Sequence, residues 1–213
     1  MAVAALVQWA AKRQKDKARV YRLRIGIANP GPRPWEDLES VVRRHSFDSP
    51  EGLAAFLRDV ALFLRRRFDK VTHVSLLGSG KVNSTEAEQQ FRSLTSEARS
   101  SYNREVLRVE GRTKAIEEKR EAATKDALTD EDGDFGVNEF FIVTMVVAVD
   151  NSVAALPEKI GSHDDVKGIL ETLGGLSSPS VLATEVVWTP AAESDIMLGD
   201  EVLTLFPDLM DIR

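Results

Sequence analysis

The sequence predicts an α+β fold: a two-layer sandwich in which helices pack against a sheet of about four strands, together with an exposed charged helix. Segments with the two-residue period of a strand alternate along the chain with segments of helical period. Such alternation is typical of a parallel α/β sheet. However, the first strand is polar on one face and few strands are indicated, and these two features favour the α+β sandwich.

Four segments have the pattern of strands. In residues 21–27, apolar residues alternate with Arg22, Arg24 and Gly26, so we expect one face of this strand to lie in water. Residues 139–150 are apolar at both alternating sets of positions, which predicts a strand in the middle of the sheet. The two other predicted strands are residues 71–77 and 181–188.

Polar capping residues mark the starts of three helices. Ser49 is followed by Pro50, a residue that suits the first position of a helix. Thr85, with Glu88 three residues later, matches a capping box. A further cap is expected at Ser162, before an apolar stripe of helical spacing.

The charges are unevenly distributed along the chain, which has 28 Lys and Arg against 34 Asp and Glu. Residues 1–81 hold 16 basic and 8 acidic side chains, whereas residues 126–213 hold 3 and 18. A basic leading end suits anionic lipid or nucleic acid, and the acidic trailing half would be repelled by either. Two solvated faces of opposite sign are the alternative, and no nucleic-acid partner is expected.

The chain divides into four segments. Residues 1–19 form a membrane-proximal basic segment, read as the possible end of a truncated anchor, and residues 110–136 form a charged insert and linker. Residues 20–109 and 137–213 are the first and second parts of one α+β domain. An amphipathic first helix packed on the domain is the alternative for the start of the chain. The basic candidates for contact with lipid are Lys12, Arg13, Lys15, Lys17 and Arg19.

No catalytic, cofactor-binding or metal-binding residue is predicted. The chain has no cysteine, which excludes thiolate chemistry and disulfides. Residues 78–81, Gly-Ser-Gly-Lys, resemble the end of a phosphate-binding loop, but Ser75 stands where the first glycine is required. Residues 130–134 are acidic but lack the spacing of a calcium loop. The histidines lack the spacing of a zinc site; they are His45, His73 and His163.

One short segment is a candidate surface for a partner. Trp188, Thr189 and Pro190 end the last predicted strand and could form an exposed hook. A tryptophan at the end of a strand is also typical of the core or its edge. Both interpretations stay open at the level of the sequence.

Five blocks of the sequence belong together: residues 49–53 (SPEGL), 86–91 (EAEQQF), 141–144 (FIVT), 185–190 (EVVWTP) and 206–209 (FPDL). Taken together, they resemble the domain-of-unknown-function-1517 family of cyanobacteria and plants. The resemblance covers residues 18–211 and is most specific in the last two blocks. The chain departs from the family pattern in its charged insert and at Gly199 and Asp200, where a hydroxyl cap is commoner.

The resemblance implies a non-enzymatic, membrane-tethered regulatory or adaptor domain of a plastid protein. It implies a role in the acclimation of photosynthesis to fluctuating light, through control of thermal dissipation. The expected place is a thylakoid or envelope membrane, with the domain in the stroma and an unknown protein as partner. Lipid is expected to contact the basic segment, and no cofactor is implied. The alternative hypothesis is a small-molecule-binding or hydrolytic domain with an unrecognised site in a cleft beside the central strand.

Overall fold

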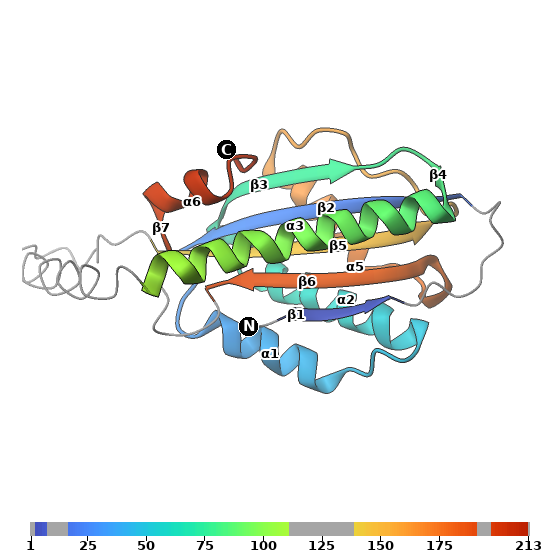
Figure 1. Ribbon diagram of the computed structural model, residues 1–213, viewed down its shortest axis with the longest axis horizontal. Helices are drawn as coiled ribbons and strands as arrows, with labels where there is room; N and C mark the ends of the chain where they lie inside the picture. Colours follow the sequence, from blue (N-terminus) through green and yellow to red (C-terminus); the bar gives the residue numbers. More distant parts are fainter. Residues whose placement is uncertain (1–2, 8–16, 111–138, 191–196, 213) are drawn as a thin grey trace, which may run out of the picture.

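The computed structural model describes residues 3–7, 17–110, 139–190 and 197–212. Within these residues the chain forms one antiparallel sheet of eight strands in the order β1-β6-β5-β2-β3-β8, with β4 paired to β2 and β7 paired to β5 (Figure 1). The longer strands are β1 (Val3–Val7), β2 (Lys17–Ala28), β3 (Val71–Gly78), β5 (Glu139–Asp150) and β6 (Val181–Thr189). The two-residue strands are β4 (Val82–Asn83), β7 (Met197–Leu198) and β8 (Met210–Asp211).

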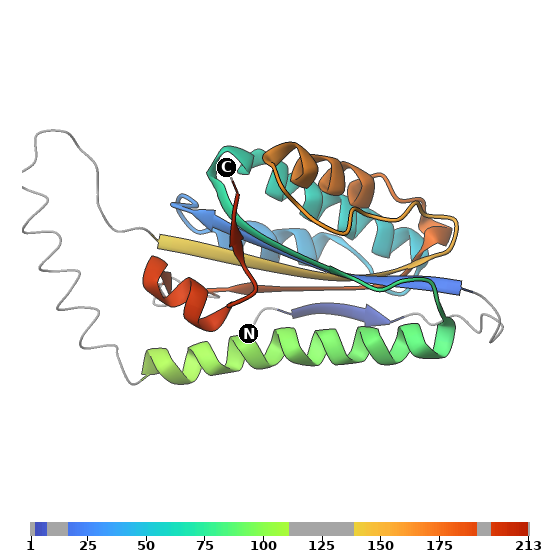
Figure 2. The same ribbon diagram turned by 90° about the horizontal axis from the view of Figure 1, so that it is seen from above.

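Helices cover both faces of the sheet. Figure 2 shows α1, α2 and α5 on one face, and α3 and α6 on the other. The first face carries the larger apolar cluster, in which the inward stripe of α2 packs on β2, β5 and β6. The helices are α1 (Pro34–Arg44), α2 (Pro50–Arg66), α3 (Ser84–Glu110), α5 (His163–Gly174) and α6 (Gly199–Leu205).

The α+β class is confirmed, but the predictions of about four strands and of two layers are wrong. The four predicted strands correspond to β2, β3, β5 and β6. Three of the remaining strands have two residues each, which is too short to produce an alternating pattern. The apolar start of the chain, read as part of an anchor or as a helix, contains β1. Much of the predicted exposed charged helix lies outside the described residues.

The prediction that β2 has one face in water is also wrong. Residues 18–27 of this strand are buried, including Arg22 and Arg24. The reason is the second helical layer, because α3 lies over the face on which these arginines stand. Strand β5 lies between β2 and β6 in the middle of the sheet, as its pattern predicts.

Two of the three predicted helix caps are confirmed. The hydroxyl of Ser49 accepts a hydrogen bond from the amide of Gly52 at 3.1 Å. Ser162 forms a full capping box with Asp165. For α3, the cap is Asn83, whose Oδ1 accepts a hydrogen bond from the amide of Glu86 at 2.9 Å. The predicted cap Thr85 lies inside that helix.

Candidate functional site

A group of charged side chains lies on the sheet face beneath α3, and its two arginines are buried. Arg22 and Arg24 come from the same face of β2, Glu97 comes from α3, and Asp208 follows α6 near the end of the chain. We call these four residues the charge cluster. Strand β2 has neighbours on both sides, so the sheet holds the two arginines in a fixed position.

Each carboxylate of the charge cluster contacts both arginines. Asp208 Oδ2 accepts a hydrogen bond from Arg22 Nη2 at 2.8 Å, and its Oδ1 accepts one from Arg24 Nη1. Glu97 Oε1 accepts a hydrogen bond from Arg22 Nη1 and lies 3.8 Å from Arg24 Nη2. The two positive and two negative charges therefore neutralise each other within one network.

The arginines of the cluster are far more buried than the carboxylates. The exposed fractions of the side chains are 6% for Arg22 and 2% for Arg24, against 49% for Glu97 and 30% for Asp208. Burial lowers the pKa of the Arg24 guanidinium, and the charge of Asp208 opposes that shift. Arg24 also donates to Thr144 Oγ1 at 3.3 Å and lies over the ring of Phe206, 4.9 Å from its centre.

A second ion pair on the same face has its charges reversed: the sheet supplies the carboxylate, and α3 supplies the arginine. Glu185, on β6, is 1% exposed and accepts two hydrogen bonds from Arg99 of α3, each at 2.7 Å. The hydrogen bond to Glu185 raises the pKa of Arg99. Arg22, Val146 and Glu185 stand in register across β2, β5 and β6. The sheet thus presents a positive and a negative charge, and α3 places Glu97 and Arg99 opposite them.

The ion pairs hold helix and chain segments against the sheet, and their geometry is not suited to proton transfer. All six charged groups are engaged in ion pairs, which hold α3 and the segment after α6 against the sheet. Two donors are left over: within the described residues, Arg22 Nε and Arg24 Nη2 are buried and have no hydrogen-bond acceptor. A buried ion pair of this kind is weak evidence of net stability, because the cost of removing the two charges from water offsets their attraction.

The basic residues proposed to face lipid are divided by the structure. Lys12, Arg13 and Lys15 lie outside the described residues. Lys17 is exposed at the start of β2. Arg19 belongs to the sheet: it is 9% exposed, and its Nη1 donates to the carbonyl of Val153 at 2.7 Å. No helix in the described part of the chain has the length and apolar character needed to cross a membrane.

The candidate partner hook is part of the interior. Trp188 is 2% exposed and Thr189 is 3% exposed, and Pro190 is buried as well. Trp188 stands beside Val143 of β5 and packs in the larger apolar cluster. The interpretation as an exposed hook is therefore wrong, and the alternative, in which Trp188 belongs to the core or its edge, is confirmed.

The histidines and the glycine-rich turn have structural partners. His45 contacts Asp59 at 2.9 Å, His73 contacts Thr72, and His163 contacts the carbonyl of Val71. Residues 78–81 connect β3 to β4. Among the described residues, no group of three or more His, Asp or Glu side chains could hold a metal ion. The acidic run at residues 130–134 lies outside them.

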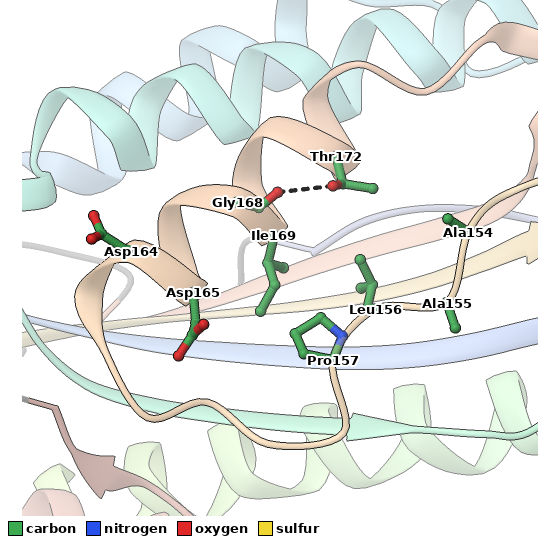
Figure 3. Close-up of a pocket in the computed structure, with 9 residues that line it drawn as sticks. All are labelled: Ala154, Ala155, Leu156, Pro157, Asp164, Asp165, Gly168, Ile169 and Thr172. Carbon is green, nitrogen blue, oxygen red and sulfur yellow. Dashed lines mark hydrogen bonds between the residues drawn. The ribbon is translucent and has the colours of Figure 1, made fainter.

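A shallow pocket of about 290 Å³ lies between α5 and the loop before it (Figure 3). Leu156, Pro157 and Ile169 supply apolar surface, and Asp164 and Asp165 lie at one end. The Asp165 carboxylate is already used in the helix cap. The pocket lies beside α5, whereas the alternative hypothesis placed a cleft beside the central strand. Its volume is at the lower end of the range for small-molecule sites.

Sequence reasoning missed both the charge cluster and the ion pair of Arg99 and Glu185, although each left one signal. Glu185 interrupts an otherwise apolar strand, and a glutamate in such a position is rarely buried unless it is paired. Asp208 stands in the FPDL block, which was singled out only for its resemblance to a family. Asp208 lies 184 positions along the chain from Arg24 and 186 positions from Arg22, so no local pattern can reveal these pairs.

Comparison with known proteins finds a matching family and similar proteins in two organisms. The family model described as "Protein of unknown function (DUF1517)" matches residues 17–212. Protein FLAP1 homolog A of Synechocystis sp. is 27% identical over 197 residues, which cover 89% of this chain and 56% of that protein. FLUCTUATING-LIGHT-ACCLIMATION protein 1, chloroplastic, of Arabidopsis thaliana is 26% identical over 192 residues, covering 90% of this chain and 46% of that protein. The chain spans about half the length of these relatives. No solved structure matches it.

Proposed function

Because this chain belongs to the DUF1517 family, we propose that it is a regulatory or adaptor domain acting in acclimation to fluctuating light. The domain works by contact with a partner protein and carries out no chemistry of its own. In the plastid, it helps to control thermal dissipation at a thylakoid or envelope membrane, with its surface in the stroma.

The observation that carries this proposal is the extent of the family match. It spans residues 17–212, and so includes β2 through β8 and all five helices described above. The name of the Arabidopsis relative supports the plastid and the role in fluctuating light. The name of the Synechocystis relative relates that protein to the same group.

Two features of the described residues support an adaptor over an enzyme. The buried ionisable groups beneath α3 are joined in ion pairs, so none of them is poised as a general base or a nucleophile. Of the two carboxylates that line the pocket beside α5, that of Asp165 is committed to a helix cap. A flat thermal-shift response across a panel of metabolites is expected, whereas a ligand-dependent rise would favour the alternative binding or hydrolytic role.

The role in light acclimation is tested by deleting the gene in the organism that carries it. Chlorophyll fluorescence is recorded under alternating high and low light and under constant light of equal dose. We expect altered thermal dissipation under alternating light, restored by the intact gene, and no difference under constant light. A deletion strain that matches its parent under both regimes would contradict the proposal.

The membrane contact is tested by flotation of the full chain with anionic and with neutral vesicles. We propose that the basic segment supplies this contact, at about 1 kcal/mol for each basic residue near an anionic surface. Replacing Lys12, Arg13, Lys15 and Lys17 by Gln should abolish flotation with anionic vesicles. The matched control removes four exposed basic residues elsewhere: Arg43, Arg58, Arg66 and Lys81. Equal loss in both variants would assign the binding to net charge alone.

The partner is to be identified by proximity labelling of the full-length protein in illuminated plastids. An adaptor is expected to label a small set of proteins reproducibly. The set recovered with a variant lacking the basic segment separates partners reached through the membrane from partners bound by the domain.

A further inference from the structure

The two halves of α3 are attached to the sheet by different interactions. In the first half, Ala87 and Phe91 are buried in an apolar cluster with residues of β2, β5 and β6, and Leu94 packs against it. After Leu94, side-chain burial in α3 is described as far as Ser101. The buried side chains in this stretch are small or polar: Thr95, Ala98 and Ser101. The first half is therefore anchored by apolar burial, and the section from Thr95 to Ser101 lacks such an anchor.

Ion pairs take the place of apolar contacts in that section. Glu97 contacts Arg22, and Arg99 contacts Glu185 through two hydrogen bonds. In both pairs the partner on the sheet is buried and the partner on the helix is about half exposed. Water therefore reaches the helix side of each pair, which weakens the attraction and makes it sensitive to salt.

The two ion pairs have opposite arrangements of charge, and this fixes the position of α3 along the sheet. The sheet presents Arg22 and Glu185 on either side of Val146, and α3 presents Glu97 and Arg99 two residues apart. A shift of α3 along the sheet would separate both pairs at once or bring like charges together. The ion pairs therefore fix the register of α3 on the sheet, although this section makes few apolar contacts.

We propose that the section of α3 from Thr95 to Ser101 is a releasable arm, which Glu97 and Arg99 hold closed. In the closed state it covers the part of the charged sheet face that contains Arg22 and Glu185. In the open state this face reaches solvent, while Phe91 keeps the first half of the helix in place. The arm gives the domain a charged surface that is accessible only on opening.

The absence of cysteine from the chain allows a direct test with single thiol probes. Ala98→Cys places a thiol on the arm, and Ala87→Cys places one in the anchored half; the two alanines are 3% and 0% exposed. Labelling of the full chain by a thiol reagent is measured at low and at high salt, with the rate of global unfolding determined in parallel. We expect Ala98→Cys to react at least about tenfold faster than Ala87→Cys, and to react faster still as salt is raised.

Charge-removing variants separate the ion pairs from general loosening. Glu97→Gln with Arg99→Gln should raise the labelling rate of Ala98→Cys several-fold. The control, Glu88→Gln with Arg92→Gln, removes an exposed ion pair of the same helix and should leave the rate unchanged. The proposal is overturned if Ala98→Cys reacts only at the rate of global unfolding, or if Glu97→Gln with Arg99→Gln leaves its labelling rate unchanged.

Discussion

Asp208 Oδ2 accepts a hydrogen bond from Arg22 Nη2 at 2.8 Å, and so joins two residues that are 186 positions apart. The other oxygen of the same carboxylate binds Arg24. Replacing Asp208 by Asn removes the negative charge and leaves two buried guanidinium groups with Glu97 alone.

We expect Asp208→Asn to lower the free energy of unfolding by about 2–4 kcal/mol, less than for a fully buried pair because Asp208 is partly exposed. Urea denaturation measures this change. Asp211→Asn is the control, because Asp211 is an exposed carboxylate in the same terminal segment, and we expect a change of no more than about 0.5 kcal/mol. Similar losses in the two variants would show that the charge cluster has no special role in holding the end of the chain.

The pair formed by Arg99 and Glu185 should show measurable coupling. Glu185 is 1% exposed, so its charge depends on Arg99 for compensation. A double-mutant cycle with Arg99→Ala and Glu185→Gln should give a coupling free energy of about 1–2 kcal/mol. The exposed pair of Glu88 and Arg92 on the same helix should give about 0.3–0.5 kcal/mol. Equal coupling in the two cycles would contradict the importance of burial here.

Much of the sheet could be predicted from the sequence because its central strands have strong local patterns. The position of β5 in the middle of the sheet was predictable, since both of its alternating sets are apolar. That pattern also indicates helices on both faces of the sheet, which is the inference that the two-layer prediction overlooked. The short strands β4, β7 and β8 form only because tertiary contacts bring them beside longer strands, so no local signal identifies them.

The charge cluster could not be predicted because it depends on what covers β2. The alternation of Arg22 and Arg24 with apolar residues is the usual pattern of a face in water. Here α3 and Asp208 supply carboxylates to the same face, so the arginines are buried and paired. A local pattern specifies which residues share a face, while the partner that neutralises a charge is set by the topology of the chain.

Gly78, the last residue of β3, and Gly80, in the turn that follows, should respond differently to substitution. A Cβ atom at Gly78 would lie 2.8–2.9 Å from the ring of Tyr21, whereas one at Gly80 would meet nothing within 4 Å. We expect Gly78→Ala to destabilise the protein by about 1–3 kcal/mol, because the Tyr21 ring is itself buried and must shift. Gly80→Ala should be neutral or stabilising by up to about 1 kcal/mol. Thermal and urea unfolding compare the two variants, and a strongly destabilised Gly80→Ala variant would point to a constraint outside the turn itself.

The cap of α5 should make stability depend on pH through Asp165. Hydrogen bonds from the amide of Gly161 and from Ser162 lower the pKa of this carboxyl in the folded protein. Because the folded pKa lies below the unfolded one, the ionised carboxylate stabilises the fold at neutral pH. This contribution is complete above the ordinary pKa of an aspartate and is lost as pH falls through the lowered value.

Asp165→Asn should therefore be less stable than the unmodified chain at neutral pH, and the difference should shrink as the pH is lowered toward about 3. Denaturant unfolding of both proteins at a series of pH values measures this difference. Asp164→Asn serves as the control, since Asp164 stands in the same first turn and should contribute only through the helix dipole. A gap between the unmodified chain and Asp165→Asn that stays constant from neutral to acidic pH would mean that the carboxylate acts through its shape and not through its charge.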